Sequence, residues 1–478
     1  MAYEVDGFNF DPRVEDPEAL RRLSRRGFFG LVGGAAAGLS LASPGRPLSA
    51  AETEITTTVP SLASLPAAPA PNDETAWEKI ASEFLLRPGL IYMNTGTRGP
   101  SPRYVHLSQV RALEGINTDY AGYTKNVANS EFNIALRRKL ASFVGAKENE
   151  IALTNNTSDG MIMGTWGPAL DPGDEIAYTN HDHVGGAHPI LHRVRRDRLG
   201  VRVIDLSDRK FHPASSPDVF VKAFEGALTP RTKLLSFCHI NYTDGGVLPV
   251  KAICEMARAK GVMTIVDGAQ PPGMMKLNLH DLGCDMYAGP FHKWMMSSMQ
   301  TGFLYVREDM VEKVEAVLTI TPAGNSMYGK PPTEPFWKEY MVGAAKYELR
   351  GSNNTPARMA MDASLDYHNH LTPQAIEARD RYLAERLRTG LRAISGVDLY
   401  VSDDPRMSCA LLSFTVKGVS TQELNDMLWE QHNIYIRSVT HEEIGWDVNR
   451  ASMHIMVTAA QVDELLGAVE AIARNARA

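Results

Sequence analysis

The sequence predicts an α/β fold, in which a large domain with a mainly parallel sheet is followed by a smaller α+β C-terminal domain. The first observation is that short runs rich in β-branched residues alternate with longer stretches of helical spacing. Such alternation is typical of a parallel sheet covered by helices on its faces. The runs that predict buried strands are residues 150–153, 175–178, 201–204, 233–237, 262–266 and 285–288.

The second observation concerns the C-terminal part of the chain. Apolar residues with helical spacing predict a terminal helix over 462–472, and Thr458 with Gln461 forms a capping box at its start. A further helix is expected over 424–430. Interleaving of this helix with strands indicates a small α+β domain. The strands are expected at 397–400, 410–415, 434–436 and 453–457.

Composition excludes several classes of protein. The chain has 478 residues, with 49 Lys and Arg against 56 Asp and Glu, and a formal net charge of -7. Without a long basic run, nothing indicates nucleic-acid binding, so a small-molecule partner is expected. The 4 Cys residues form no C-x-x-C pair and are too few for a disulfide framework in a chain of this length.

The N-terminus resembles a twin-arginine export signal. Ser24-Arg25-Arg26 is followed by a small, apolar and uncharged run, and Ser49-Ala50-Ala51 suits a signal peptidase. The alternative is a retained membrane anchor, but the run is short for one. We expect a signal peptide over 1–51, and a periplasmic or extracellular protein that the twin-arginine machinery exports already folded.

Three further segments complete the expected organisation. Residues 52–75 are rich in Thr, Ser, Ala and Pro and predict a flexible linker. Residues 76–345 are expected to form the large domain, with an N-terminal segment that contributes to the small domain. Residues 346–478 are expected to form the small domain.

Two residues point to the chemistry. Asp267 ends a buried strand, where parallel sheets bind ligands, and Lys293 follows the next strand in an apolar, aromatic setting. Desolvation there would favour a free amine, which can form a Schiff base. A lysine for the aldehyde and a carboxylate for the ring nitrogen are what pyridoxal 5'-phosphate requires. Alone, the pair is a weak signal, since an Asp at a strand end is more often a cap and a Lys after His can be a surface residue.

Several other motifs occur in order along the chain. They are Tyr92 to Gly96, Thr154 to Gly160, Thr179 to His183, Val266 to Gln270, His292 to Trp294, Thr301 to Val306, Gly351-Ser352 and Arg450 to His454. Together they resemble the class V aminotransferase family, and especially its isopenicillin N epimerase-like branch. The resemblance covers about residue 92 to the C-terminus. It implies a fold-type I enzyme with a seven-stranded sheet in the large domain and pyridoxal 5'-phosphate as cofactor.

The resemblance also implies roles at the cofactor's phosphate and ring. Thr157 and Ser158, at a predicted helix start, would bind the phosphate, which suits a helix N-terminus, although simple capping explains them too. Asp182-His183 matches an acidic residue followed by the ring that stacks on the pyridine, so His183 is expected there and is also a candidate catalytic residue. His181 is the reserve.

The remaining roles follow from the same resemblance. Asp267 would pair with the pyridinium, Gln270 would touch the phenolic oxygen, and Lys293 would hold the aldehyde, with His292 near the phosphate. Gly351 and Ser352 would reach the phosphate from a second subunit, which implies a homodimer with shared active sites. Asn94 and Arg450 would bind the substrate; a guanidinium suits the α-carboxylate.

Some positions depart from the family pattern. Pro290 and Tyr242 stand where relatives carry small polar residues, so the resemblance does not assign phosphate or ring contacts at these two positions. Arg350 is either a second carboxylate contact or a surface charge. No Cys occurs in the segment 436–450, where cysteine desulfurases carry one, and this argues against that activity.

The sequence supports an exported enzyme that acts at the Cα of an amino acid or of a metabolite containing one. Lys293 would move the Cα proton as general acid/base. Epimerase, lyase and aminotransferase outcomes stay open. The rival hypothesis is a non-catalytic binding protein on a degenerate scaffold, and the joint presence of Lys293, Asp267 and Arg450 argues against it. A metal site at His181-Asp182-His183 is the weaker reading, because no further ligand cluster completes it, and no metal is expected.

Overall fold

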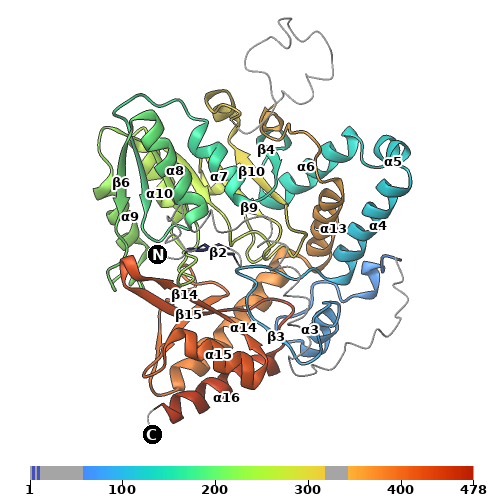
Figure 1. Ribbon diagram of the computed structural model, residues 1–478, viewed down its shortest axis with the longest axis vertical. Coiled ribbons are helices and arrows are strands. Elements are labelled where there is room, and N and C mark those ends of the chain that lie inside the picture. Colours follow the sequence, from blue (N-terminus) through green and yellow to red (C-terminus); the bar gives the residue numbers. More distant parts are fainter. Residues whose placement is uncertain (1–2, 6–7, 11–57, 318–342, 477–478) are drawn as a thin grey trace, which may run out of the picture. The chain divides into compact units, whose positions relative to one another are not determined.

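A seven-stranded sheet forms the centre of the fold, in the order β4-β10-β9-β8-β7-β5-β6 (Figure 1). The computed structural model describes residues 3–5, 8–10, 58–317 and 343–476. The strands are β4 (Ile151–Thr154), β5 (Glu175–Thr179), β6 (Gly200–Ile204), β7 (Thr232–Cys238), β8 (Met263–Asp267), β9 (Met286–Pro290) and β10 (Gly302–Val306).

Most of this sheet is parallel, as the sequence predicted. Strands β5 to β9 pair in parallel with one another, whereas β10 is antiparallel to both of its neighbours, β9 and β4. The predicted strand at 201–204 is present, but the prediction that it is buried was wrong. Strand β6 lies at the edge of the sheet, and Val201 and Val203 are 39% and 49% exposed.

Helices cover both faces of the sheet, and β8 shows how. Ile265 packs in one apolar cluster with Ile190 of α8, while its neighbour Val266 packs in another cluster with Ile253 of α10. Successive side chains of a strand point to opposite faces, so the two clusters are the two sides of the sheet. The helices concerned are α6 (Ser130–Val144), α7 (Thr157–Trp166), α8 (Val184–Asp197), α9 (Pro217–Ala227), α10 (Val250–Ala259) and α11 (Leu279–Leu282).

A second, antiparallel sheet with the order β11-β12-β15-β14 forms the smaller domain, drawn in orange and red in Figure 1. Its strands are β11 (Val397–Leu399), β12 (Leu411–Val416), β14 (Arg437–His441) and β15 (Trp446–Ser452). The helices beside it are α14 (Pro373–Ala393), α15 (Thr421–His432) and α16 (Ala459–Asn475). The predicted capping box of Thr458 and Gln461 is confirmed at the start of α16.

The N-terminal part of the large-domain sequence reaches into this smaller domain. Strand β3 (Ile91–Tyr92) pairs in parallel with β13 (Ile434–Tyr435). The remaining helices of this part and of the junction are α3 (Glu74–Ala81), α4 (Arg103–Thr118), α5 (Tyr120–Asn126) and α13 (Thr355–Leu371). Short 3-10 helices are η1 (Leu62–Ser64), η2 (Glu148–Glu150), η3 (Glu308–Lys313), η4 (Gly343–Tyr347) and η5 (Glu442–Ile444).

Two sequence predictions differ from the structure. Residues 453–457 form a loop and not a strand. The apolar side chains of this loop are all buried, and an apolar run in the sequence does not distinguish a buried loop from a buried strand. The part of the predicted linker that the structure describes, residues 58–75, packs against the fold at several points. Leu65 is buried, and the carbonyl oxygens of Ala70 and Pro71 accept hydrogen bonds from Trp77 Nε1 (2.8 Å) and Arg379 (2.9 Å).

The chain divides into two units, residues 1–56 and 57–478. In the first, β1 (Tyr3–Val5) and β2 (Phe8–Phe10) pair antiparallel. The motif Ser24-Arg25-Arg26 and the rest of the predicted signal after residue 10 lie outside the described residues. Among the helices that the structure describes, none is both long and apolar enough to cross a bilayer.

Candidate active site

Asp267 stands at the carboxyl end of β8, near the middle of the sheet. Its residue is only 6% exposed, and Oδ1 accepts a hydrogen bond from Ala269 N at 2.9 Å. Burial raises the pKa of this carboxyl, and the charge of Lys293 opposes that shift. The start of α8 also comes close, because a Cβ on Gly186 would lie 3.3 Å from Asp267 Oδ2. A buried carboxylate here calls for a cationic partner.

Lys293 follows β9, the strand beside β8, so both residues emerge at the same region of the sheet. The backbone around it is fixed by neighbours. Met296 N donates to Lys293 O at 2.9 Å, and Gly99 N donates to His292 O at 2.9 Å. A Cβ on Gly99 would lie 1.9 Å from Lys293 O, so only glycine allows this approach.

Trp294 anchors the same loop from the other side. Its indole N–H donates to Gln270 Oε1 at 2.8 Å, and its carbonyl oxygen lies 3.0 Å from His454 Nε2 and 3.1 Å from His368 Nε2. Gln270 Nε2 in turn donates to Gly96 O at 3.1 Å. Gln270 therefore links the end of β8 to the lysine loop; its predicted contact with the cofactor's phenolic oxygen stays a prediction.

The N-terminus of α7 provides a place for an anion. Asn156 caps the helix by accepting from Asp159 N at 2.9 Å. Thr157 is buried, and its Oγ1 has no hydrogen-bond partner within the part of the chain that the structure describes. Ser158 faces the start of α8, since a Cβ on Gly185 would lie 2.6 Å from its Oγ. An unpaired buried hydroxyl at a positive helix end suits a phosphate.

His183 caps α8 and lies in the same region. Its Nδ1 accepts from Gly185 N at 3.1 Å, which requires an unprotonated Nδ1. Although part of the residue is exposed, desolvation by the surrounding protein, followed by the charge of Lys293, lowers its pKa to about 3. The ring is therefore neutral and within range of the charge of Lys293, and its stacking on the cofactor stays a prediction.

His181 lies in a different cluster. Its Nδ1 is 2.8 Å from Thr243 Oγ1, and its ring is 4.6 Å from that of His212 and 5.0 Å from that of Trp446. The carboxylate of Asp182 accepts backbone N–H groups at both oxygens, from residues 179 and 238. The side chains of 181, 182 and 183 thus have separate partners and do not converge as metal ligands.

Arg450 and Arg437 define the other end of the site. They face each other in the register of β15 and β14, and both donate to Thr97 Oγ1, at 3.3 and 3.0 Å. Thr97 donates to Asn94 Oδ1 at 2.8 Å, so both predicted substrate residues belong to one network. Tyr242 O accepts from Arg450 at 2.5 Å.

This network carries uncompensated positive charge. Arg450 is 1% exposed, and burial, followed by the charge of Arg437, lowers its pKa. Its Nε has no hydrogen-bond partner, and neither arginine has a carboxylate partner, among residues 58–317 and 343–476. A buried charge without a counter-ion is costly, so the arrangement is suited to bind an anionic group of a ligand.

Arg350 lies elsewhere. Its guanidinium forms an ion pair with Asp159 in the first turn of α7, and its side chain is 21% exposed. It is therefore neither a fully solvated charge nor a neighbour of Arg450 in this network. The next residues, Gly351 and Ser352, are exposed on the chain's surface. Their predicted contact with a partner subunit's phosphate stays a prediction.

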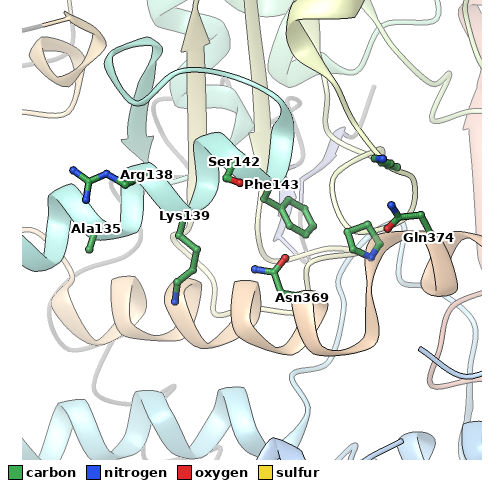
Figure 2. Close-up of a pocket in the computed structure, with 9 residues that line it drawn as sticks. Ala135, Arg138, Lys139, Ser142, Phe143, Asn369 and Gln374 are labelled. Atoms are coloured by element: carbon green, nitrogen blue, oxygen red, sulfur yellow. The ribbon is translucent and has the colours of Figure 1, made fainter. Parts of the chain in front are cut away.

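A pocket apart from this cluster lies between α6, α13 and the start of α14 (Figure 2). It has a volume of about 470 Å³ and shares no lining residue with the candidate site. Lys139, one of its charged residues, is paired with Asp362 and Asp366 at 2.5 and 2.8 Å. The positive charge of Lys139 is thus compensated, and none of the cofactor or substrate residues predicted from the sequence lines this pocket.

The residues present fit pyridoxal 5'-phosphate. The phosphate would meet the α7 N-terminus at Thr157, where a buried hydroxyl is unpaired. The ring nitrogen, when protonated, would supply the cation that buried Asp267 calls for, and Lys293 would hold the aldehyde. His183, neutral because of its lowered pKa, would face the ring.

Thr97 and His441 were not assigned roles from the sequence, and Arg437 was considered only as a replacement for Arg450 at the substrate carboxylate. Thr97 directly follows the motif Tyr92 to Gly96, and only its contacts with Arg437 and Arg450 show that it belongs to the site. Arg437 and Arg450 are 13 positions apart in the printed sequence, and the hairpin register brings them together. His441 ends β14 and is bonded to Tyr242, a residue that the sequence marked only as a departure.

A family model described as aminotransferase class V matches residues 117–465, most of the chain. The chain belongs to the class V aminotransferase family. Pyridoxal 5'-phosphate is therefore its cofactor, and its substrates are amino-acid-like. In this class V enzyme, Asp267, Lys293 and the α7 N-terminus are the groups expected to hold the cofactor, and their roles stay predictions.

Curated relatives carry two kinds of name. The class V enzyme is 28% identical over 410 residues to isopenicillin N epimerase of Streptomyces clavuligerus, which covers 83% of this chain and 98% of that protein. It is 28% identical over 407 residues to isopenicillin N epimerase of Amycolatopsis lactamdurans, which covers 84% and 99%. A probable cysteine desulfurase of Methanothermobacter thermautotrophicus is 27% identical over 424 residues and covers 83% and 98%.

Solved structures share the fold. The apo structure of cysteine desulfurase from Thermococcus onnurineus superposes with a TM-score of 0.71 at 22% identity and covers 83% of this chain and 98% of that one. A mutant of C-DES with glycine covalently linked to the PLP cofactor gives 0.70 at 22% identity and covers 81% and 98%. Identity at this level establishes the fold of the class V enzyme, and its reaction must be argued from its own residues.

Proposed function

We propose that this protein is an exported enzyme that removes the Cα proton of an amino-acid-like substrate. The observation that carries the proposal is the spacing of charge along one site. Asp267 and Lys293 lie close together, and the charges of both Lys293 and Arg450 act on His183. Arg450, which has no carboxylate partner among the described residues, is linked through Thr97 to Asn94. A substrate whose α-carboxylate binds Arg450 would then place its amino group and Cα toward Lys293.

Each residue has a physical task. When bound, pyridoxal phosphate withdraws electrons from the substrate Cα and so acidifies the C–H bond. Arg450 binds the carboxylate and fixes the orientation of Cα. Lys293 Nζ accepts the Cα proton and later returns one. Asp267 holds a proton at the ring nitrogen, and neutral His183 packs against the ring without adding charge.

The cysteines separate this proposal from desulfurisation, the activity in the names of several relatives. A desulfurase needs a reactive thiol that receives sulfur. All four cysteines here are buried, and burial raises the pKa of each thiol. None lies on the β14–β15 hairpin that carries Arg450. Epimerase, lyase and aminotransferase outcomes agree with this chemistry, and the two isopenicillin N epimerases among the relatives support an epimerase.

The test is exchange of the α-proton. The purified, cofactor-loaded protein would be incubated in D2O with each proteinogenic L-amino acid and with N-acylated and α-amidated controls. We expect deuterium at Cα of at least one free amino acid, measured by mass spectrometry, with less in its amide because Arg450 loses its partner. A loaded enzyme that exchanges no α-proton contradicts the proposal.

Export and assembly are part of the proposal. The pattern Ser24-Arg25-Arg26 supports twin-arginine export, and the exposed Gly351-Ser352 loop supports a dimer with shared sites. Changing Arg25 and Arg26 together to Lys should leave active, loaded precursor in the cytoplasm. An unchanged distribution between periplasmic and cytoplasmic fractions would indicate a different route.

A further inference from the structure

Tyr242 takes part in a chain of polar contacts that the roles described so far do not use. Its hydroxyl is hydrogen-bonded to His441 Nε2, at the end of β14. His441 Nδ1 lies 3.3 Å from Glu443 Oε1, and Glu443 is exposed. A phenol is thereby connected through an imidazole to a carboxylate in contact with solvent. Such a chain can carry protons between a partly buried site and water.

The contacts of Tyr242 place it beside the reacting carbon. Its ring meets the ring of His183 edge-on, with centroids 5.0 Å apart and an interplanar angle of 83°. Its carbonyl oxygen accepts from Arg450 at 2.5 Å. His183 is the residue assigned to the cofactor ring, and Arg450 is the one assigned to the α-carboxylate. In a bound substrate, Cα lies between the amino group, which faces the cofactor, and the α-carboxylate. Tyr242 therefore adjoins the expected position of Cα.

The order of the sheet separates Tyr242 from Lys293. Asp267 ends β8; Lys293 follows β9 on one side of it, and Tyr242 follows β7 on the other. His183 follows β5, on the same side as Tyr242. Lys293 and Tyr242 therefore follow strands on opposite sides of β8, the strand that carries the residue expected to hold the ring nitrogen.

We propose that Tyr242 is a second catalytic acid that protonates Cα on the side opposite Lys293, so that the enzyme inverts the configuration at Cα. The inference rests on the proposed removal of the Cα proton and adds its stereochemical outcome. His441 is a positioning residue that supplies a proton to the phenol, and Glu443 orients its imidazole ring.

The protons balance without any redox partner. Lys293 Nζ takes the proton as the first Cα–H bond breaks. The O–H bond of Tyr242 then breaks as a new Cα–H bond forms on the opposite side, and the phenolate oxygen takes a proton from His441 Nε2. Solvent reprotonates His441 through the exposed end of the chain, and Lys293 releases its proton to solvent. Burial raises the pKa of Tyr242, which keeps the phenol protonated and ready to donate.

The first part of the test separates exchange from inversion. The loaded parent and Tyr242→Phe would be compared in D2O with the L-amino acid that exchanges fastest in the screen above, by chiral chromatography and mass spectrometry. The parent should give the D-isomer with deuterium at Cα. Tyr242→Phe should retain exchange in the recovered L-isomer to within about threefold and lose inversion by at least about a hundredfold. Tyr435→Phe, a change of an exposed tyrosine, is the matched control and should behave as the parent.

The second part needs neither substrate nor cofactor. In the cofactor-free protein labelled with ¹⁵N-histidine, the ring signals of His441 are identified by their loss in His441→Gln. Tyr242→Phe should shift these signals and change their dependence on pH, because the phenol contact is removed, whereas Tyr435→Phe should not. If the Tyr242 hydroxyl had only a packing role, Tyr242→Phe would still invert the substrate in the first part of the test.

The outcomes divide cleanly between the two proposals. A parent that exchanges no α-proton contradicts the proposed function. A parent that exchanges with retention only, or a Tyr242→Phe variant that still inverts, overturns the assignment of Tyr242 and leaves the proposed function standing. Loss of exchange and inversion together in a loaded, folded Tyr242→Phe, or unmoved His441 signals, also overturns it. Loss of inversion alone with shifted His441 signals supports it.

Discussion

Arg437 and Arg450 lie directly opposite each other on β14 and β15, and both donate a hydrogen bond to Thr97 Oγ1. Two like charges at paired positions of a sheet destabilise it unless a counter-ion is present. The structure thus keeps two guanidinium groups together at the cost of stability. A negatively charged substrate group would relieve that repulsion, so the pair is suited to a binding site.

Replacing Arg450 with Lys should chiefly weaken substrate recognition. Lys keeps the charge but loses the planar fork that matches a carboxylate. We expect a loss of about 2 to 4 kcal/mol of transition-state stabilisation, or roughly thirty-fold to a thousand-fold in kcat/KM, with normal cofactor content. Steady-state kinetics with a free acid and its amide check this. Arg386→Lys, on the surface beside Asp463, is the control. Full kcat/KM in Arg450→Lys would place the carboxylate elsewhere.

Thr97→Val should have a smaller effect of the same kind. Valine has nearly the shape of threonine but no Oγ1, so Arg437, Arg450 and Asn94 lose the atom that joins them. Loss of such a bridging hydroxyl costs about 1 to 1.5 kcal/mol, which corresponds to about a five- to tenfold higher KM. Unchanged KM, with unfolding by urea as in the parent, would show that the bridge does not position the arginines for substrate.

Asp267→Asn should preserve the fold and impair turnover. The neutral amide cannot hold the ring nitrogen protonated, so a charge-assisted contact worth about 1.5 to 3 kcal/mol is lost, or roughly ten- to a hundredfold in kcat. Circular dichroism and the cofactor's absorbance report fold and loading separately from rate. Parent-like turnover would mean that the ring nitrogen does not lie at Asp267.

His183 should stay neutral far below the usual titration range of histidine. Its folded pKa, about 3, lies below the ordinary value of 6.5, so the unfolded chain binds this proton first and stability falls as pH drops below about 6.5. In the cofactor-free protein, the ¹⁵N signals assigned through His183→Phe should not move between about pH 5 and 8. A titration midpoint near 6.5 would remove the reason for placing a neutral ring on the cofactor.

The sequence predicted the parts of the fold that depend on local pattern. β-Branched runs marked β5, β7 and β8. The last residue of β8 and the loop after β9 gave Asp267 and Lys293 as expected neighbours, because neighbouring parallel strands end at one edge. Burial could not be predicted where topology decides it. Strand β6 lies at the edge of the sheet, although its sequence resembles that of an inner strand.

Contacts between distant segments were also beyond sequence reasoning. Thr97 meets Arg437 and Arg450 because β3 joins the small domain through β13. The bond of Tyr242 to His441 depends on where the β14–β15 hairpin turns. No periodicity of hydrophobic residues reports such geometry, and at Tyr242 the only signal was a departure from the family pattern.

The most direct test of the account is the identity of the lysine that holds the cofactor. The purified protein would be reduced with borohydride, digested and mapped by mass spectrometry, with Lys276→Arg, a change of another lysine of the large domain, treated in parallel. The account predicts one pyridoxyl group, on Lys293, in both proteins, and none on that residue in Lys293→Ala. A pyridoxyl group on another lysine of the parent, or a well-folded protein that binds no cofactor, would contradict it.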